Sequence, residues 1–295
     1  MNVSVILVNH NGLERTRNAV KSVKKSSPRS EIILVDNNST DGSVECLRRE
    51  FPEVKLVPSS ENRGFGAGSN RGADVALGEF LFFLNSDTLL TEDTPILLAT
   101  MMQGNPHVAA CGPRLINDDN TFQLSFGPDL SLLNEWKLRR MHRRLQSSDP
   151  SVQAEFESRY PAAREVDWVT GAALMIRRDA FQKVGGFDET FFMYFEDADL
   201  CRRVRKLGLK VLYSPSTKVV HFGGDKGVNP ESKIALEYRR SQLRYYRKHA
   251  GGVGYLLLRA YLISKFSLRW LLSFAGRRNT RPLAAEVMKI SLRGV

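Results

Sequence analysis

Residues 80–87 read Phe-Leu-Phe-Phe-Leu-Asn-Ser-Asp. The apolar run 80–84 is entered from Gly78 and left at a polar turn, a pattern typical of a buried strand in a parallel sheet. A carboxylate at the carboxyl end of such a strand lies where open α/β sheets place their ligands. Asp87 is therefore a candidate for holding a divalent cation against a phosphate-bearing substrate, because hard cations take oxygen ligands. This stretch alone also allows a plain turn, since Asn, Ser and Asp are ordinary turn residues.

The segments around 80–87 alternate between strand and helix patterns along the first hundred residues. Strands are expected at 3–8, 31–35 and 55–57, and helices over 13–23, from Ser43 as a capping residue, and from the acidic start 91–93. This alternation predicts an α/β fold with a mostly parallel sheet and helices on both faces.

The composition, 42% hydrophobic and 25% charged, is that of an ordinary globular protein. The 295 residues suffice for one large domain or two small ones. The three cysteines are odd in number and widely spaced, which argues against a disulfide framework and for a reducing compartment. Met1 leads directly into a strand-like run without a secretory signal pattern, so a cytoplasmic location is expected.

The pattern changes after Cys111. We expect a hairpin at 115–126, a basic helix at 131–145, a polar stretch at 146–161, strands at 168–176, 210–213 and 218–221, and helices at 179–184 and 196–207. In the last helix Leu200, Val204 and Leu207 are expected to face inward. Residues 127–165 are interpreted as an inserted, mobile helical arm within a domain that spans 1–232.

Polar clusters follow three of the expected parallel strands, at 9–12, 36–39 and 85–87. Because the carboxyl ends of parallel strands meet at one edge of a sheet, we expect these clusters to converge into a site. Between them lies the glycine-rich segment 62–72, where Arg63 and Arg71 are suited to phosphate. Its glycines allow close backbone approach, and the following helix offers free N–H groups to an anion. It matches neither the dinucleotide fingerprint nor the Walker loop, and a flexible turn remains the alternative.

The second half adds an aromatic run that delivers Glu196 and Asp197 to the first turn of a helix. Acids are favoured there by the helix dipole alone, and this explanation is strong for Asp199. For Glu196 and Asp197 the aromatic surroundings indicate a dry pocket, in which a carboxylate can act as a general base. His221 ends a strand before a glycine pair, and beside an aspartate it is a candidate cation ligand.

Together these motifs resemble the inverting glycosyltransferases of family two, in a branch similar to rhamnosyltransferases. The resemblance covers about residues 3–224 and rests on the order and spacing of motifs at 8–11, 35–39, 62–72, 84–87, 168–172, 185–188, 196–197 and 221–224. It implies the GT-A fold, a Rossmann-like, mixed and mostly parallel sheet flanked by helices, followed by a C-terminal helical tail.

The resemblance also implies residue roles in sugar transfer from a nucleoside-diphosphate donor. Asp87 and His221 would bind Mg²⁺ or Mn²⁺, and Asp197 would deprotonate the acceptor, with Glu196 orienting it. The donor nucleotide would contact Asn9, Asp36, Asn38, Arg63, Gly64, Asn70, Asn85 and Ser86, and the donor sugar or acceptor Trp168, Gly171, Ala172 and Asp188. Asn85 stands where the family commonly has the first Asp of its Asp-x-Asp motif, which leaves strict metal dependence open.

The tail, 233–295, holds 14 of the 43 Lys and Arg residues and 2 of the 32 Asp and Glu residues, a net charge of +12. Residues 1–232 have a net charge of −1. Within 255–275 three basic residues interrupt an apolar segment, so a membrane span is disfavoured and a helix lying in the membrane interface is expected. A helix packed on the catalytic domain is the alternative.

These observations predict a sugar transferase, peripheral on the inner face of the cell membrane, with a lipid-linked or polysaccharide acceptor. Rhamnose from dTDP-rhamnose is the first candidate donor, and no nucleic-acid partner is expected. Two other classes stay open: a sugar nucleotidyltransferase, and a non-catalytic membrane or nucleic-acid binder on a transferase scaffold. A homodimer is also left open.

Overall fold

The structure is a computed structural model that describes residues 2–146, 149–223, 233–275 and 281–294. Its main sheet has ten strands. Along the sheet run β3 (Lys55–Pro58), β2 (Glu31–Asp36), β1 (Val3–Asn9), β4 (Phe80–Asn85), β11 (Ala173–Arg177), β6 (Val108–Ile116), β12 (Lys210–His221) and β5 (Thr88–Leu90), with β7 (Phe122–Gln123) on β6 and β9 (Arg164–Glu165) on β12. A second sheet pairs β10 (Trp168–Val169) with β8 (Phe126–Gly127).

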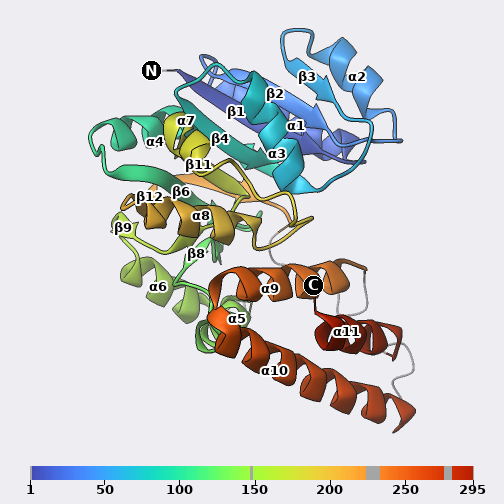
Figure 1. The fold of residues 1–295 in the computed structure, drawn as a ribbon. Coiled ribbons are helices and arrows are strands. Elements are labelled where there is room, and N and C mark those ends of the chain that lie inside the picture. The colour runs from blue at the N-terminus through green and yellow to red at the C-terminus, as the bar shows by residue number, and fades with distance from the viewer. Residues whose placement is uncertain (1, 147–148, 224–232, 276–280, 295) are drawn as a thin grey trace.

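Helices cover both faces of the sheet and form a separate group at the C-terminal end (Figure 1). They are α1 (Leu13–Ser26), α2 (Ser43–Glu50), α3 (Phe65–Val75), α4 (Thr94–Gln103), α5 (Leu132–Leu145), α6 (Pro150–Arg159), α7 (Arg178–Lys183), α8 (Glu196–Lys206), α9 (Lys233–His249), α10 (Gly251–Leu272), the 3₁₀ turn η1 (Ser273–Ala275) and α11 (Arg281–Arg293). The expected α/β architecture with a helical tail is confirmed.

Strand β4 lies in the middle of the core, as its apolar run predicts. All five residues from Phe80 to Leu84 are at most 2% exposed. Phe82 packs in the cluster under α1 and α4, whereas Phe83 packs in the opposite cluster under α8, with its ring 4.9 Å from that of Phe187. Burying one such phenylalanine contributes about 1.5–3 kcal/mol to folding. The strand is parallel to β1 but antiparallel to β11, which makes the sheet mixed.

The polar strand ends converge as expected. In the parallel register Asn9 is opposite Asp36, and Val8 is opposite Asn85. Across the sheet β12 brings His221 opposite Thr88 on β5. The carboxyl ends of β1, β2 and β4 therefore form one edge, to which β12 adds its histidine.

Several local expectations were wrong. Residues 210–221 form one strand rather than two, because β12 continues along β6 through an irregularity between Ser214 and Lys218. Residues 168–176 form two strands, β10 and β11, and α4 begins at Thr94, after its acidic residues. Leu207 is 49% exposed, since α8 ends at Lys206 and the chain turns there.

The N-terminal cap of α2 is also different from the one expected. Ser43 is the first helical residue, and the preceding Gly42 takes a left-handed φ of 79°. The Asp41 carboxylate accepts hydrogen bonds from both the backbone N–H and the hydroxyl of Ser43. Asp41 therefore supplies the acceptor that sequence reasoning assigned to Ser43.

The segment 127–165 is packed rather than projecting. Its helix α6, which sequence reasoning missed, is capped by the side chain of Asp149 and buries Phe156 completely. The other helix, α5, buries Glu135, whose carboxylate accepts hydrogen bonds from Gln242 and Tyr246 of α9. The inserted arm thus contacts the tail through Glu135, and its mobility stays a prediction.

The tail is docked through α9. Leu243, Tyr245 and Tyr246 share a buried cluster with Phe191 and Phe195, which precede α8. Helices α10 and α11 pack on α9 from below (Figure 1). No helix among the described residues is long and apolar enough to cross a membrane.

Candidate active site

Asp87 and His221 meet at the edge of the sheet where β4 and β12 end. His221 Nε2 lies 3.3 Å from Asp87 Oδ1 and 3.4 Å from Asn85 Nδ2. The other ring nitrogen, Nδ1, is 2.7 Å from Gln123 Oε1. Gln123 donates through Nε2 to Asn117 Oδ1, so Oε1 must be the acceptor toward the histidine. Nδ1 therefore carries a proton, and Nε2 faces Asp87, where it donates to the carboxylate when protonated and offers its lone pair to a cation when deprotonated.

The surroundings keep Asp87 ionised. Burial would raise its pKa, but the hydrogen bond and charge of His221 and the charge of Arg15 outweigh burial and lower that pKa. A side chain at Gly223 would overlap Asp87 Oδ2, so this position accepts only glycine without rearrangement. No group of three or more His, Cys, Asp or Glu residues suited to a metal occurs in the described part of the chain. Any cation at Asp87 and His221 would need further ligands from a substrate, from water or from an amide such as Asn85.

The edge formed by β1 and β2 is a closed hydrogen-bond network. Asp36, 1% exposed, accepts from Asn9 Nδ2 at 2.8 Å and from the backbone N–H of Ser39 at 2.8 Å. Asn9 in turn accepts from Thr16 Oγ1 at 2.7 Å. Asn38 is exposed, with a left-handed φ of 62°. The network fixes the loop that follows β2. Of the predicted nucleotide ligands Asn9, Asp36 and Asn38, only Asn38 is exposed to solvent.

The glycine-rich segment leads into α3 and joins the two halves of the site. Gly64 has a φ of +91°, and a side chain there would overlap the carbonyl of Phe192. Asn70 donates to the carbonyl of Phe187 at 2.9 Å and accepts from its N–H at 2.9 Å. Arg63 pairs with Glu189 at 3.1 Å, and Arg71 donates to Ser59. Asn70 and Arg71 thus bind protein groups, and Arg63, with its side chain 49% exposed, remains accessible.

Glu196 and Asp197 begin α8 with different surroundings. Asp197 Oδ2 accepts from the N–H of Gly171 at 2.9 Å, and Oδ1 from that of Ala198 at 2.7 Å. Burial raises the pKa of Asp197, although these donors oppose the rise. Burial and the charge of Asp197 raise the pKa of Glu196 well above its ordinary value, and Glu196 Oε2 has no hydrogen-bond partner among the described residues. The two carboxyls therefore differ: the pKa of Glu196 is raised well above its ordinary value, whereas two backbone N–H groups stabilise the ionised form of Asp197.

The turn before α8 is strained. Tyr194 and Phe195 both have a φ of 70°, in the left-handed region that bulky residues rarely adopt. Such conformations cost about 1–3 kcal/mol each and cluster at active sites. Here they turn the chain so that Asp197 lines a cavity of about 910 Å³ bounded by α5, α8, α9 and α10.

A short chain of contacts links Asp197 to Asn85, which lies beside the Asp87–His221 pair. The Gly171 N–H binds Asp197, and the next carbonyl, of Ala172, accepts from the N–H of Asn85 at 3.0 Å. A side chain on Gly171 would lie 3.0 Å from the Phe65 ring and 3.7 Å from Asp197 Cβ. Trp168 lines the same cavity as Asp197 and donates Nε1–H to the carbonyl of Pro128 at 2.9 Å.

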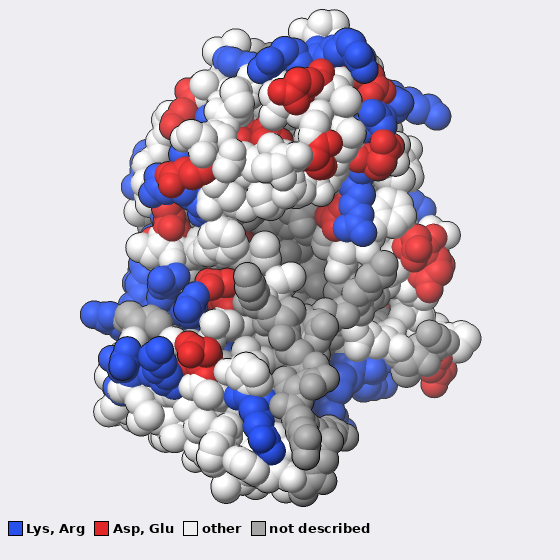
Figure 2. Space-filling view, turned by 90° about the vertical axis from the view of Figure 1, so that its right-hand side faces the viewer, with Lys and Arg blue, Asp and Glu red and all other residues white. Residues whose placement is uncertain are grey.

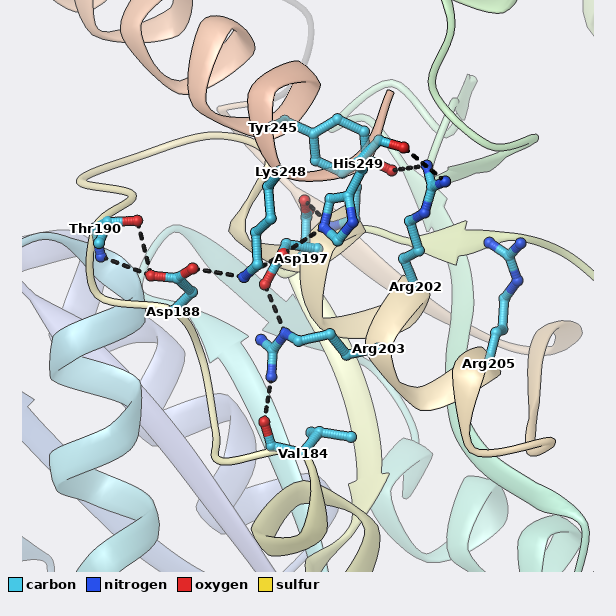
Figure 3. A network of polar contacts seen from close by, with 12 residues as sticks. Val184, Asp188, Thr190, Asp197, Arg202, Arg203, Arg205, Tyr245, Lys248 and His249 are labelled. Carbon is cyan, nitrogen blue, oxygen red and sulfur yellow. Dashed lines mark hydrogen bonds and ion pairs between the residues drawn. The ribbon is translucent and has the colours of Figure 1, made fainter. Parts of the chain in front are cut away.

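Asp188 and Asp199 belong to a network that holds the tail (Figure 3). Lys248 of α9 lies 2.5 Å from Asp188 Oδ2 and 2.7 Å from Asp199 Oδ1. Asp199, fully buried, also accepts from Arg203 at 2.7 Å and from His249 Nε2 at 2.6 Å. Asp188 thus pairs with Lys248 of α9, and its expected place near the acceptor stays a prediction. Asp199 has a docking role beyond its favourable position in the helix dipole.

Asp199→Asn is expected to lower the free energy of unfolding at neutral pH but to change it much less in acid. Burial would raise the pKa of Asp199, but His249, Arg203 and Lys248 outweigh it and lower that pKa to about 2. A carboxyl with a depressed folded pKa stabilises the fold above its unfolded pKa of about 4 and loses this contribution as pH falls toward 2, a difference of about 2 kcal/mol.

Urea unfolding at pH 7, 4 and 2.5 measures this effect. The difference in free energy of unfolding between wild type and Asp199→Asn should be large at pH 7 and small at pH 2.5. The matched control is Asp179→Asn, which removes an exposed i,i+4 pair with Lys183 and should change stability by less than about 0.5 kcal/mol at every pH. A gap of equal size at all three pH values would contradict the assigned charge network.

Three features of the site were missed by sequence reasoning. Gln123 orients His221, Lys248 ties the tail to two carboxylates, and α5 and α10 wall the cavity. A lone glutamine in a hairpin carries no recognisable pattern. The cavity is lined by helices that are far apart in sequence, so no local sequence pattern could predict it.

Comparison with known proteins identifies the family. The family model described as "Glycosyl transferase family 2" matches residues 4–185, and another described as "N-terminal domain of galactosyltransferase" matches 153–223. The N-acetylglucosaminyl-diphospho-decaprenol L-rhamnosyltransferase of Mycobacterium tuberculosis is 30% identical over 263 residues, which cover 81% of this chain and 84% of the relative.

Two solved transferases share the fold, each with a TM-score of 0.58. The mannosyltransferase PcManGT from Pyrobaculum calidifontis, in complex with GDP-Man and Mn²⁺, is 14% identical and aligns over 99% of this chain and 86% of its own. GalNAc-T7, with UDP, GalNAc and Mn²⁺, is 19% identical and aligns over 82% of this chain and 47% of its own. The chain belongs to glycosyl transferase family 2 and is a glycosyltransferase with the GT-A fold.

Proposed function

We propose that this enzyme transfers a sugar from a nucleoside diphosphate to a hydroxyl of a lipid-linked diphosphate sugar, with inversion at the anomeric carbon. L-rhamnose from dTDP-rhamnose is the first candidate donor. The name of the M. tuberculosis relative, which specifies L-rhamnosyl transfer to a decaprenol-diphosphate sugar, supports both assignments. The observation that carries the proposal is the chain of contacts from Asp197 through Gly171, Ala172 and Asn85 to the Asp87–His221 pair.

Asp197 is the proposed general base. Its raised pKa makes it a stronger base than an exposed carboxylate, and its two backbone donors fix its orientation. The acceptor oxygen attacks the anomeric carbon as the bond to the diphosphate breaks, and the hydroxyl proton passes to Asp197. Inversion in one displacement requires no second carboxylate as nucleophile, so Glu196 needs no covalent role.

Asp87 and His221 fit a divalent cation, because they offer one carboxylate oxygen and, once Nε2 is deprotonated, one imidazole nitrogen on the same side. Bound Mg²⁺ or Mn²⁺ would supply positive charge that stabilises the leaving diphosphate. The Mn²⁺ in the two structural neighbours supports this assignment. Since the described residues supply only two charged or imidazole ligands, we expect metal and nucleotide to bind together.

Titration calorimetry with dTDP, UDP, GDP and ADP, each with and without Mn²⁺, tests the donor assignment. We expect dTDP to bind most tightly, UDP next, and Mn²⁺ to strengthen binding at least about tenfold, since one charge-assisted contact contributes about 1.5–3 kcal/mol. A preference for GDP or ADP would contradict the assigned donor, and binding indifferent to Mn²⁺ would contradict the metal.

We further propose that α10 holds the protein peripherally on the inner face of the membrane. Six apolar side chains on its outward side are 56–74% exposed: Val253, Leu256, Leu257, Leu268, Leu271 and Leu272. Their helical spacing places them on one face. In Figure 2 the lower end of the molecule, where Figure 1 places α10, is largely white, with Lys and Arg side chains above it.

Two of the three basic residues of α10 contact protein groups, although all three were expected to face lipid headgroups. Arg259 donates to the carbonyls of Ser291 and Leu292 on α11, and Arg269 lies over the Phe266 ring. The surface that α10 offers to a membrane is therefore apolar, and insertion of each leucine is favoured by up to about 1.5–3 kcal/mol.

Glutamate substitutions on the outward face test this proposal. Leu257→Glu and Leu271→Glu should each weaken binding to anionic liposomes at least about tenfold in a flotation assay, because each loses more than 1.4 kcal/mol of apolar transfer. Leu77→Glu, at a leucine that is 75% exposed outside the tail, is the matched control and should bind as wild type does. Equal losses in all three variants would exclude α10 as the membrane contact.

A further inference from the structure

The cavity that ends at Asp197 has a basic rim formed by helices far from the donor edge. Arg139 and Arg143 stand at i,i+4 on α5, so both present their heads on one side of the helix. Lys265 of α10 lines the same cavity. We refer to Arg139, Arg143 and Lys265 as the basic rim.

Two members of the basic rim have spare binding capacity. Arg143 contacts only the carbonyl of Arg139, at 3.4 Å, and Lys265 the hydroxyl of Tyr261, at 3.2 Å, and neither pairs with a carboxylate among the described residues. Arg139 is paired with Glu135, which also accepts from two groups of α9. The acid in the rim is therefore already neutralised, and the site carries a net positive charge.

The cations also crowd one another. Burial lowers the pKa of Lys265, and the nearby charges of Arg239 and Arg139 lower it further, against the opposing effect of Tyr261. Arg239 lies behind the rim, stacked on the Tyr238 and Phe266 rings. Uncompensated like charges of this kind favour an anionic ligand, and guanidinium and ammonium groups suit phosphate oxygens.

Beyond the rim the surface becomes apolar. Leu268 lies three residues after Lys265 on α10 and seven after Tyr261, and Leu272 lies seven after Lys265. These positions share one side of the helix, so the mouth of the cavity continues into the outward apolar face of α10. The cavity lining thus combines a carboxylate, aromatic and apolar side chains and three cations, and it adjoins the apolar face of α10.

We propose that the basic rim binds the diphosphate of the acceptor, with the acceptor sugar reaching Asp197 and the lipid chain leaving along α10. This inference rests on the proposed lipid-linked acceptor. It assigns acceptor recognition to α5 and α10, on the opposite side of Asp197 from the Asp87–His221 pair. The donor diphosphate and the acceptor diphosphate thus occupy separate sites.

The test uses the full-length variants Arg143→Gln and Lys265→Met and their combination, with Arg140→Gln as matched control. Arg140 is exposed on the same helix and lies over Trp136, outside the cavity lining. With a polyprenyl-diphosphate sugar as acceptor, each rim variant should raise the acceptor KM about 10–100-fold, and Arg140→Gln should not. The donor KM and the slow hydrolysis of donor by water should stay unchanged in all variants.

A phosphate-free alkyl glycoside of the same sugar separates charge recognition from pocket damage. The rim variants should use it as well as wild type does, and an equal loss with both acceptors would overturn the proposal. If the variants lose liposome binding but keep the acceptor KM in detergent solution, the rim binds phospholipid headgroups and the proposal also fails.

Direct binding of farnesyl diphosphate, measured by calorimetry, is independent of catalysis. Wild type should bind it and the double variant should not, and equal binding would overturn the rim assignment. If wild type binds farnesyl diphosphate but transfers sugar to no lipid diphosphate, the proposed function fails while the rim assignment stands.

Discussion

Asp197→Asn is expected to lower the rate of sugar transfer about 10²–10⁴-fold, the usual contribution of a positioned general base. The asparagine keeps one acceptor for the N–H groups of Gly171 and Ala198 but cannot take the acceptor proton. Since Asp197 is on the acceptor side of Gly171, donor affinity should change little. Single-turnover transfer and donor calorimetry measure the two effects separately.

Glu196→Gln is the matched comparison, because Glu196 is buried beside Asp197 but its Oε2 has no hydrogen-bond partner among the described residues. It should lose far less activity than Asp197→Asn. The wild-type rate should fall as pH decreases through the raised pKa of Asp197, since only the ionised base is active. If Glu196→Gln loses more transfer activity than Asp197→Asn, then Glu196 rather than Asp197 is the general base.

The sheet edge could be predicted because it needs only local information. Alternating strand and helix patterns imply parallel strands, and parallel strands bring Asn9, Asp36 and Asn85 to one edge. The strand before His221 also ended where its apolar pattern ended. For these positions the hydrophobic period and chain direction are sufficient, and no tertiary detail is required.

Other features depend on contacts that no local pattern specifies. Leu207 fits the apolar period of α8, yet the helix ends one residue earlier and leaves it exposed. Asp188 matched a motif near the acceptor, but its charge is bound by Lys248, 60 residues later. The basic residues of α10 were expected to face lipid, and partners on α11 instead draw Arg259 inward. For Asp188 and Arg259 a long-range partner decided the orientation, whereas Leu207 is exposed because the helix ends before it.

Asp87→Asn is expected to weaken Mn²⁺ binding in the presence of nucleotide by 100-fold or more and to lower transfer accordingly. Asn85 already replaces one carboxylate of the usual motif, so Asp87 is the only anionic ligand that the described residues provide at the pair. Removing its charge leaves His221 as the sole strong ligand within the described part of the chain. Mn²⁺ titration monitored by electron paramagnetic resonance measures the affinity directly.

Gln123→Leu tests the same site through the orientation of His221. Without the acceptor at Nδ1 the ring loses its fixed tautomer, and loss of such an outer partner typically costs about 10–100-fold in metal affinity. Higher Mn²⁺ should restore much of the activity in Gln123→Leu, because both ligands remain. Arg15→Gln, which removes an exposed contact 3.8 Å from Asp87, should change affinity less than about fivefold. If Asp87→Asn and Gln123→Leu both keep wild-type Mn²⁺ affinity, the cation does not bind at this pair. The leaving diphosphate must then be stabilised by arginine side chains such as Arg63 alone.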